Sequence, residues 1–425
     1  MTETHDLNLR HLLAVASIAQ AGSIAAALPL VSLSQPALTQ AIGRLEKQLD
    51  HTLFERHPGG MIATEAARLL VPRIERARTY IARGVQVARR TVHLPVLPAV
   101  ERRVTLGQLR ALTAVDADGS YSLAATRSGI SQPAVYRAVS ELSELIEVPL
   151  VVRRGKTVQP TLAATRMLRF VRLARAELDA GLDELAALRS KGAGRIVLGA
   201  LPLARAILLP QVLSRFSRAN PGASVNVIEG PYIEMLTHLR EGGLDMIVGA
   251  MRNPPPVRDV KQEGMFDDDP VIVARTEHPL AGRALSFDAL LDYPWVIAAI
   301  GAPVRARWEQ MFRERSLEPP RLRIECGSVL IIRGLLLEDD WLTLMSRDQF
   351  LVEQRAGLLR ELGTAGPSVR RRIGLTTRAD WHPTRLQTQF VDTFRQVCTE
   401  RTDYGESGKW PFRHAQANPV IAKIA

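Results

Sequence analysis

The feature that most constrains how this sequence can fold is an internal repeat. Ser34-Gln35-Pro36-Ala37 returns as Ser131-Gln132-Pro133-Ala134, at an offset of 97 residues. The same offset, applied without a gap to residues 7–84, gives 20 identities in 78 positions. Chance leaves only a handful, so we expect two copies of one small structural unit. A repeat of this kind has to be recognised before any fold is assigned.

The pattern inside one copy predicts three helices followed by a small hairpin. The first helix places four apolar side chains on one face, and these are Leu9, Leu12, Leu13 and Ile18. Gly22-Ser23 ends it and caps the next helix. Ser34 is expected to cap a third helix, where Pro36 is harmless because first-turn amides lack helical partners. Residues 53–56 and 61–64 then read as two short strands around a tight turn, which completes a winged helix-turn-helix.

The exposed side chains of this unit are suited to DNA. A helix fits the major groove and needs hydrogen-bonding side chains for base edges, while hairpin arginines supply phosphate contacts that position without specifying. The candidate DNA-binding residues are Ser34, Gln35, Pro36, Thr39, Gln40, Arg44 and Arg56 in the first copy, and Ser131, Gln132, Tyr136, Arg137, Arg153 and Arg154 in the second. A polar face that only meets solvent is the alternative, but recurrence of the whole arrangement favours DNA.

The sequence resembles the LysR-type transcriptional regulators. The matching segments are Leu-Arg-His-Leu at 9–12, Gly22-Ser23, Ser34-Gln35-Pro36-Ala37-Leu38-Thr39, Arg44-Leu45-Glu46, Leu53-Phe54-Glu55-Arg56 and Thr64-Glu65-Ala66. The resemblance covers nearly the whole chain, but the family normally carries one such unit. Residues 104 to about 400 would already make a complete regulator, with residues 1–103 as an extra reading head.

The two copies differ where bases would be read. Tyr136 and Arg137 replace Thr39 and Gln40, Glu141 replaces Arg44, and the second hairpin is more basic through Arg153, Arg154 and Lys156. Carboxylates near phosphate are repulsive, although one can accept from cytosine. We expect the first copy to have side chains better suited to contact bases, and the second copy to have side chains better suited to contact phosphates. Whether both copies bind DNA stays open. Pro29 should shorten or kink the second helix of the first copy.

Each copy leads into a long amphipathic helix. Residues 65–90 carry an apolar stripe at helical spacing, and so do residues 161–190. In the resembled family such a helix pairs with its twin in a dimer. The first helix could pair between chains or repeats, or pack on its own domain. The second is the stronger candidate for a dimer seam. Residues 91–103 hold Pro95 and Pro98 and are expected to form a tether between the heads.

The rest of the chain alternates strands and helices, which implies parallel sheets covered by helices. Strands are expected at 195–199, 224–228, 246–249, 271–274, 295–298, 322–326, 342–345 and 373–377, and helices at 205–219, 233–241, 304–315, 329–337, 347–356 and 385–399. Two lobes with crossovers near 255–275 and 346–372 are expected. The region resembles the family's effector domain, a two-lobed α/β periplasmic-binding-protein-like (type 2) fold. Residues 191–194 read as a hinge.

Ligands of open α/β sheets bind beyond the carboxyl ends of strands, near helix amino termini. The candidate effector-binding residues chosen on this basis are Pro202, Leu203, Ala250, Ile300 and Ser328. Each could equally be an ordinary loop residue. The resembled family often has Ser or Thr where Leu201–Leu203 stand, so this apolar loop argues against a purely anionic ligand.

Other classes of function find little support in the sequence. The net charge of +11 is basic but does not by itself establish nucleic-acid binding. Cys326 and Cys398 have no metal-like spacing, the histidines are scattered, and Asp267-Asp268-Asp269 reads as a solvated turn rather than a metal site. An enzyme is therefore disfavoured, and we expect no catalytic residue, metal or cofactor. A purely architectural DNA-binding protein would leave residues 195–400 without a role.

These observations predict a multidomain, sequence-specific DNA-binding transcription factor that responds to a small-molecule effector. The expected segments are 1–64 (first winged unit), 65–103 (helix and tether), 104–161 (second unit), 162–192 (dimerisation helix), 193–400 (effector domain) and 401–425 (flexible tail). Its expected partners are double-stranded DNA, the effector and further copies of itself, as a homodimer or homotetramer. With no run of 18 apolar residues and no signal pattern, a cytoplasmic protein away from membranes is expected.

Overall fold

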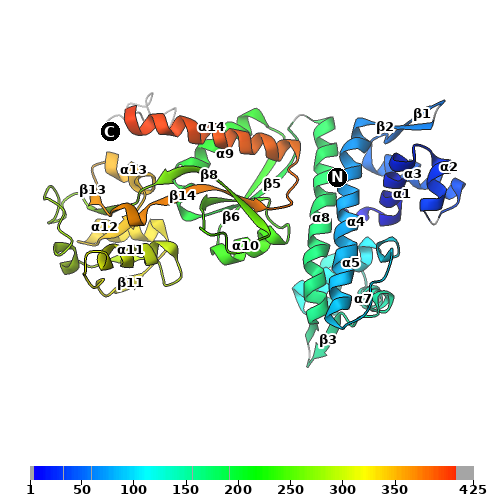
Figure 1. Cartoon of the computed structure of the whole chain (residues 1–425), viewed down its shortest axis with the longest axis horizontal. Helices are drawn as coiled ribbons and strands as arrows, with labels where there is room; N and C mark the ends of the chain where they lie inside the picture. Colours follow the sequence, from blue (N-terminus) through cyan, green and yellow to red (C-terminus); the bar gives the residue numbers. More distant parts are fainter. Residues whose placement is uncertain (1–3, 32, 59, 156, 191, 408–425) are drawn as a thin grey trace.

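The computed structural model describes residues 4–31, 33–58, 60–155, 157–190 and 192–407. Two long helices stand side by side in the middle of the molecule (Figure 1). The two repeat units lie on one side of this helix pair, near its opposite ends, and the C-terminal α/β region lies on the other side (Figure 1).

The first unit consists of short helices and a hairpin, as predicted. Its elements are η1 (Thr4–Asp6), α1 (Leu9–Ala21), α2 (Ile24–Ala27), η2 (Leu28–Leu30), α3 (Gln35–Leu49), β1 (Phe54–His57) and β2 (Gly60–Ala63). The α2 helix has only four residues and passes into the 3-10 turn that contains Pro29. The prediction of a short second helix is confirmed, because proline lacks an amide to continue the helical ladder.

The second unit repeats the first. Its elements are η3 (Val100–Arg102), α5 (Leu106–Asp118), α6 (Tyr121–Ser128), α7 (Gln132–Ile146), β3 (Val151–Arg154) and β4 (Thr157–Pro160). Equivalent hydrogen bonds tie each hairpin to its first helix: Met61 N donates to Gly22 O and Val158 N donates to Gly119 O, both at 2.8 Å. Lys156, predicted to add charge to this hairpin, lies outside the described residues.

The expected caps are confirmed at one position and wrong at another. The Ser23 hydroxyl accepts from Ala26 N at 3.1 Å, as predicted. Ser34 and Ser131 occupy N-cap positions, but neither side chain makes a capping hydrogen bond. A capping oxygen accepts from the second or third helical amide, and Pro36 and Pro133 remove the second one.

The long helices are α4 (Glu65–Thr91) and α8 (Leu162–Arg189). They run antiparallel, since Leu70 lies against Gly181 and Gly84 lies against Met167. Their apolar stripes merge with both units into a single cluster of buried side chains. The expected seam on α8 is thus covered by α4 of the same chain, which corrects the prediction that this stripe joins two chains. Of the alternatives for α4, packing between repeats is confirmed.

The first lobe of the C-terminal region is a five-stranded sheet with the order β6-β5-β7-β14-β8. Its strands are β5 (Gly194–Ala200), β6 (Ala223–Ile228), β7 (Met246–Ala250), β8 (Val260–Asp268) and β14 (Arg371–Arg378), and its helices are η4 (Pro202–Arg205), α9 (Leu208–Ala219), α10 (Tyr232–Arg240) and α14 (Arg385–Ser407). Leu198, Phe216 and Phe390 are fully buried in its core.

The second lobe is smaller. Strands β9 (Val271–Arg275), β12 (Thr343–Met345) and β13 (Leu359–Thr364) form one sheet, and β10 (Val296–Ile297) pairs with β11 (Ile324–Glu325). Its helices are η5 (Ala289–Asp292), α11 (Pro303–Arg313), α12 (Val329–Glu338), α13 (Arg347–Arg355) and η6 (Pro367–Val369). The chain enters this lobe between β8 and β9 and leaves it between β13 and β14, within the two crossover regions expected from the sequence.

The strand directions differ from the prediction of parallel sheets. β5 is parallel to β6 and β7, but β14 is antiparallel to both β7 and β8, and β9 is antiparallel to β12 and β13. A strand that returns from another lobe can enter a sheet in either direction.

Arg401–Ser407, assigned to a flexible tail, continue α14; residues 408–425 lie outside the described part.

The aspartates at 267–269 do not form the solvated turn expected from the sequence. They lie along the connection between the lobes, where three consecutive arginines pair with them in register. Asp268 meets Arg371 at 2.7 Å, Asp269 meets Arg370 at 2.7 Å, and Asp267 meets Arg372 at 3.2 Å.

Within the described residues, no single helix has both the length and the apolarity to span a bilayer; the bent pair Leu9–Ala21 and Ile24–Leu30 passes on length and composition alone.

Candidate nucleic-acid interface and ligand cavity

The α3 helix presents one polar face to solvent and packs its other face inside the first unit. Leu38, Ile42 and Leu45 are buried against the core. The predicted DNA-binding positions on this helix are exposed, and these are Ser34, Gln35, Pro36, Thr39, Gln40 and Arg44. Thr39 Oγ1 donates to Gln35 O at 3.0 Å, which holds its hydroxyl against the helix. Burial and the nearby Arg44 charge lower the pKa of His11.

The α7 helix has the same orientation of faces but a different surface. Ser131, Gln132, Tyr136 and Arg137 are exposed. The Tyr136 ring packs edge-on against Tyr121 with ring centroids 5.4 Å apart, so this side chain is held in place although it is 54% exposed. The second unit therefore presents a rigid aromatic group where the first presents Thr39.

The hairpins carry the predicted phosphate-contacting arginines. Arg56 on β1 and Arg153 and Arg154 on β3 are all exposed. Arg153 Nε donates to Gly155 O at 3.3 Å across the turn. Arg153 lines the same surface hollow as Gln132 and Tyr136 of α7, so this guanidinium can contact a DNA phosphate near that helix.

A cavity of about 660 Å³ lies between the two lobes. Of the predicted effector residues, Pro202, Leu203 and Ala250 line it, whereas Ile300 and Ser328 do not. The Ile300 side chain is 82% exposed on the turn before α11, and Ser328 N is bonded to Cys326 Sγ. The neighbouring Gly301, Ala302 and Gly327 line the cavity instead.

Three arginines face this cavity: Arg252, Arg307 and Arg371. Arg371 is paired, since its Nε donates to Asp268 and its Nη2 to Ser346 Oγ, both at 2.7 Å. Among the described residues, no carboxylate lies within ion-pair distance of Arg252 or Arg307, and none of the lining residues is acidic. Burial, together with repulsion from the other cavity arginines, lowers the pKa of Arg252 and of Arg307.

Tyr232 adds a polar group to the same wall. The Arg252 guanidinium lies 4.4 Å from the centre of the Tyr232 ring, a distance typical of a cation–π contact. The buried Tyr232 hydroxyl has no hydrogen-bond partner among the described residues. A buried polar atom without a partner is costly. Two uncompensated cations and a free hydroxyl therefore suit a ligand that brings its own negative charge.

Sequence reasoning missed the cavity arginines. Arg252 follows β7 by two residues, so the rule that ligands sit beyond strand ends could have found it. Arg307 and Arg371 carry no such signal, because only the tertiary fold brings α11 and β14 to the same cavity. The remaining lining side chains are mostly apolar, which agrees with the apolar first loop noted in the sequence.

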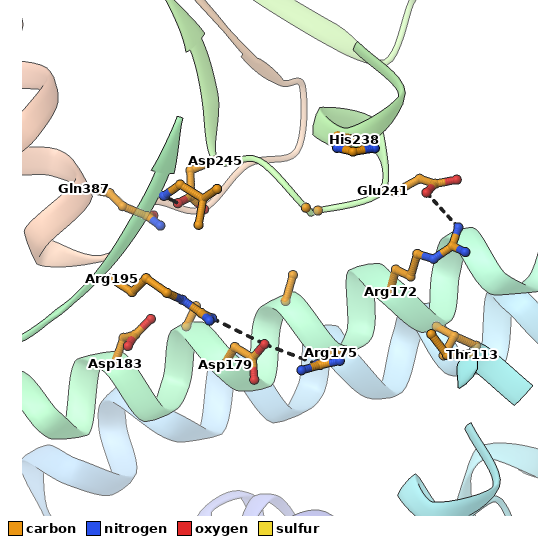
Figure 2. A pocket seen from close by; sticks show the side chains of 16 residues that line it. Thr113, Arg172, Arg175, Asp179, Asp183, Arg195, His238, Glu241, Asp245 and Gln387 are labelled. Atoms are coloured by element: carbon orange, nitrogen blue, oxygen red, sulfur yellow. Dashed lines mark hydrogen bonds and ion pairs between the residues drawn. The ribbon is translucent and has the colours of Figure 1, made fainter. Parts of the chain in front are cut away.

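A second cavity, of about 500 Å³, separates α8 from the first lobe (Figure 2). Arg195 of β5 lies 3.5 Å from Asp179, and Arg172 meets Glu241 at 2.7 Å, so ion pairs connect the two sides. Asp183 lies beside Arg195 on α8 (Figure 2). Burial, reinforced by Asp179, Asp245 and Glu184, raises the pKa of Asp183 to about 7 despite the opposing charge of Arg195.

The first lobe also contacts α4. Tyr80 donates to Asp380 Oδ2 at 2.7 Å, and Arg73 donates to His382 O at 2.8 Å. Both long helices are therefore tied to the lobe through polar contacts.

Comparison with known proteins agrees with this arrangement. Residues 9–68 and 106–165 both match the family described as "Bacterial regulatory helix-turn-helix protein, lysR family", and residues 189–399 match "LysR substrate binding domain". The chain is 31% identical to the HTH-type transcriptional regulator GalR of Pseudomonas putida, over 93% of this chain and 98% of that protein. It is 26% identical to the regulator PcaQ of Agrobacterium fabrum, over 72% of this chain and 98% of PcaQ.

Solved structures show the same fold at lower identity. CbnR, a LysR family transcriptional regulator, matches with a TM-score of 0.51 and 18% identity, over 68% of this chain and 98% of CbnR. A full-length OxyR variant from Pseudomonas aeruginosa matches with a TM-score of 0.51 and 19% identity, over 69% and 98%.

Helix-turn-helix sequences joined to a substrate-binding domain define a DNA-binding transcriptional regulator that responds to a small molecule, and not an enzyme. The chain belongs to the LysR family of transcriptional regulators. The resemblance inferred from the repeated motif is thereby confirmed.

Proposed function

We propose that both repeat units are DNA-reading heads, each a winged helix-turn-helix. The heads comprise residues 1–64 and 104–161, the first long helix and the tether comprise 65–103, and the second long helix comprises 162–192. The effector domain comprises residues 193–407, because α14 continues to Ser407. The observation that supports this proposal is that α3 and α7 expose polar faces at equivalent positions, and that each is followed by a hairpin with at least one exposed arginine. The base-reading residues are the exposed ones on these helices, and Arg56, Arg153 and Arg154 contact phosphates.

The proposed effector site is the cavity between the lobes, which together form a periplasmic-binding-protein-like domain. Arg252, Arg307 and the Tyr232 hydroxyl bind an anionic group, and the apolar walls at Pro202, Leu203 and Ala250 contact the rest of the ligand. Ile300 and Ser328, predicted from the sequence, lie at the rim and have no assigned contact. A small organic acid with an apolar body fits both properties.

Ligand binding is proposed to act through the connection between the lobes. Arg371 faces the cavity and is paired with Asp268 at that connection. An anion in the cavity that attracts Arg371 competes with Asp268 and thereby changes the angle between the lobes. The contacts of the first lobe with α4 and α8 then transmit this change to the heads. The proposed location is the cytoplasm, where the bacterial chromosome lies.

Assembly beyond one chain stays a prediction. The apolar stripe of α8 is covered by α4, so a homodimer or homotetramer would have to use other surfaces. The C-terminal lobes lie on the side of the helix pair away from the heads (Figure 1), so their outer faces are candidates for such contacts.

Two measurements test the proposed function. Genomic fragments selected by the full chain should share a common sequence, and selection without enrichment would reject the regulator's sequence specificity. Heating with matched pairs of small organic acids and their neutral amides should raise the melting temperature only for an acid, because a ligand that binds the folded state stabilises it by mass action. Equal effects of acid and amide would rule out the anionic ligand.

A further inference from the structure

The seam between α4 and α8 has an approximate two-fold symmetry. A Cβ added to Gly84 would lie 3.0 Å from Phe170 Cβ and 3.5 Å from Met167 Cγ. A Cβ added to Gly181 would lie 2.9 Å from Leu70 Cδ1 and 3.3 Å from Arg73 Cβ. Under the 97-residue offset Gly84 corresponds to Gly181, Leu70 to Met167 and Arg73 to Phe170. The two contacts are therefore copies of one another, as in a two-fold dimer interface.

This symmetry is broken at a buried ion pair. Arg73 Nη1 lies 3.0 Å from Glu177 Oε2, and Arg76 Nε lies 2.8 Å from Glu177 Oε1. The side chains of Arg73 and Glu177 are only 8% and 7% exposed. Under the same offset Arg73 corresponds to Phe170, and Glu177 corresponds to Tyr80. The seam thus has one charged half and one aromatic half.

The broken symmetry disfavours pairing between like helices of two chains. An α4–α4 pair would place Arg73 opposite Tyr80, and an α8–α8 pair would place Phe170 opposite Glu177. An α4–α4 pair would leave two buried Arg73 side chains without a carboxylate, and an α8–α8 pair would leave two buried Glu177 side chains without an arginine. Burying an unpaired charge is strongly unfavourable. Only an α4–α8 pair satisfies Arg73 and Glu177. Such exclusion of wrong partners is a common way to obtain specificity.

The tether keeps this pair within one chain. Arg89, near the end of α4 and 3% exposed, donates to Pro95 O and to Ile146 O, both at 2.7 Å. These bonds fix the tether against the second unit, and Val100 and Val104 after it are buried in the common core. A short, anchored connection gives the two helices a high effective concentration for each other.

The two heads held by this seam are not equivalent readers. Gln35 and Gln132 occupy matching exposed positions, but Gln40 is matched by Arg137, and Arg44 by Glu141. Glutamine favours adenine, arginine favours guanine, and glutamate accepts from cytosine. A pair of heads joined by a two-fold axis normally reads two copies of one half-site. Here the same geometry holds two different reading surfaces.

We propose that a single chain forms the complete two-headed DNA-reading unit, and that its operator consists of two different half-sites in inverted orientation. The proposal rests on the DNA-binding function argued above, because it concerns how the two heads are used. One chain then contacts both half-sites, whereas a palindromic operator is contacted by two identical chains. The operator of this protein is therefore asymmetric.

The test uses the full chain and an operator obtained by selection from genomic fragments. If its half-sites are A and B, three duplexes are compared at fixed spacing: A with inverted B, A with inverted A, and B with inverted B. We expect each palindrome to bind at least tenfold more weakly than the mixed site. Titration with hydroxyl-radical footprinting should show two protected half-sites for each chain bound.

Matched variants identify which head reads which half. Gln35→Ala with Gln40→Ala changes the first head, and Gln132→Ala with Arg137→Ala changes the equivalent positions of the second. Each double variant should lose protection and base preference at one half-site only, and at a different one. All four side chains are exposed, so far-ultraviolet circular dichroism should match that of the parent chain.

Several results would overturn the inference, and only the first of them leaves the proposal of two DNA-reading heads intact. Tighter binding to either palindrome would mean that like heads of two chains read the operator. One protected half-site per chain would mean that only one head is used, as would loss of all protection in one double variant and none in the other. Absence of any preferred duplex would instead reject the DNA-reading function on which the inference rests.

Discussion

Gly84 on α4 lies so close to α8 that a Cβ at this position would be 3.0 Å from the Cβ of Phe170. A glycine in a helix interior costs about 1 kcal/mol relative to alanine, and the same loss recurs at Gly181. The close approach that these two residues permit joins the two repeat units into one body. This explains why the two repeat units and the helix pair share one continuous core.

Replacing Gly84 by Leu should destabilise the chain, because the added side chain would overlap Phe170 and Met167. Overpacking of this kind costs about 1–3 kcal/mol, measurable as a lower free energy of unfolding in urea. Gly107→Leu is the matched control: Gly107 is an exposed residue of α5, where an added Cβ meets only Thr105 Oγ1 at 3.9 Å. Equal stabilities of the two variants would contradict the close seam.

Replacing Arg44 by Ala should weaken binding to the selected operator and relax preference at one base pair. A good bidentate contact discriminates by about 1–3 kcal/mol. Fluorescence anisotropy with single-base variants of the operator measures the effect. Unchanged preference would show that α3 does not read bases through Arg44. Lys261→Ala, an exposed charge on β8 far from the heads, is the control.

Replacing Arg153 and Arg154 together by Ala should affect DNA binding differently from the Arg44→Ala change. These hairpin arginines are expected to contact phosphates, so binding should weaken by a similar factor on all sequences. The slope of log binding constant against log salt concentration should become shallower by about 1 for each lost contact. A change in sequence preference with the salt slope unaltered would argue against the phosphate role.

Replacing Arg307 by Met should reduce the preference for an acid over its neutral amide. The change keeps an unbranched apolar stem and removes one uncompensated cation from the cavity, so affinity for an anionic ligand should fall about 10- to 100-fold, in the range of charged contacts. Calorimetric titration measures it. The exposed Arg321 provides the control, since Arg321→Met changes the same charge outside the cavity. An unaltered affinity would remove Arg307 from the site.

Replacing Asp183 by Asn should stabilise the chain at high pH. Its pKa is about 7 in the folded protein, against an ordinary value of 3.8, so the folded state holds the proton more tightly than the unfolded state. The contribution of this carboxyl to the free energy of unfolding therefore falls as the pH rises from 4 to 7 and is then constant. The variant should lose this slope and gain about 1–3 kcal/mol at pH 8, within the ~4 kcal/mol that the shift allows.

Urea unfolding at pH 5 and pH 8 measures this difference. Asp288→Asn, at an exposed position in the second lobe, should leave the pH dependence of the parent chain intact. An Asp183→Asn variant with the same pH slope as the parent chain would show that this carboxyl does not hold a proton at the junction with α8.

Local patterns predicted most helices but missed particular strands. Leu9, Leu12 and Ile18 repeat at helical spacing because a helix buries one face, and all three are buried. β8 was missed because it lies at the edge of its sheet and alternates polar with half-buried residues. β13 is also an edge strand, and neither shows the continuous apolar run of a central strand.

The sequence by itself determined the repeat, the two exposed polar faces, the long amphipathic helices and the family, because the spacing of neighbouring residues indicates each of them. Only the tertiary structure decided that α4 pairs with α8 of the same chain, and that Arg252 and Arg307 face one cavity. Partners such as Arg73 and Glu177 are 104 residues apart. Which distant groups meet depends on how whole elements pack, and no local periodicity records that.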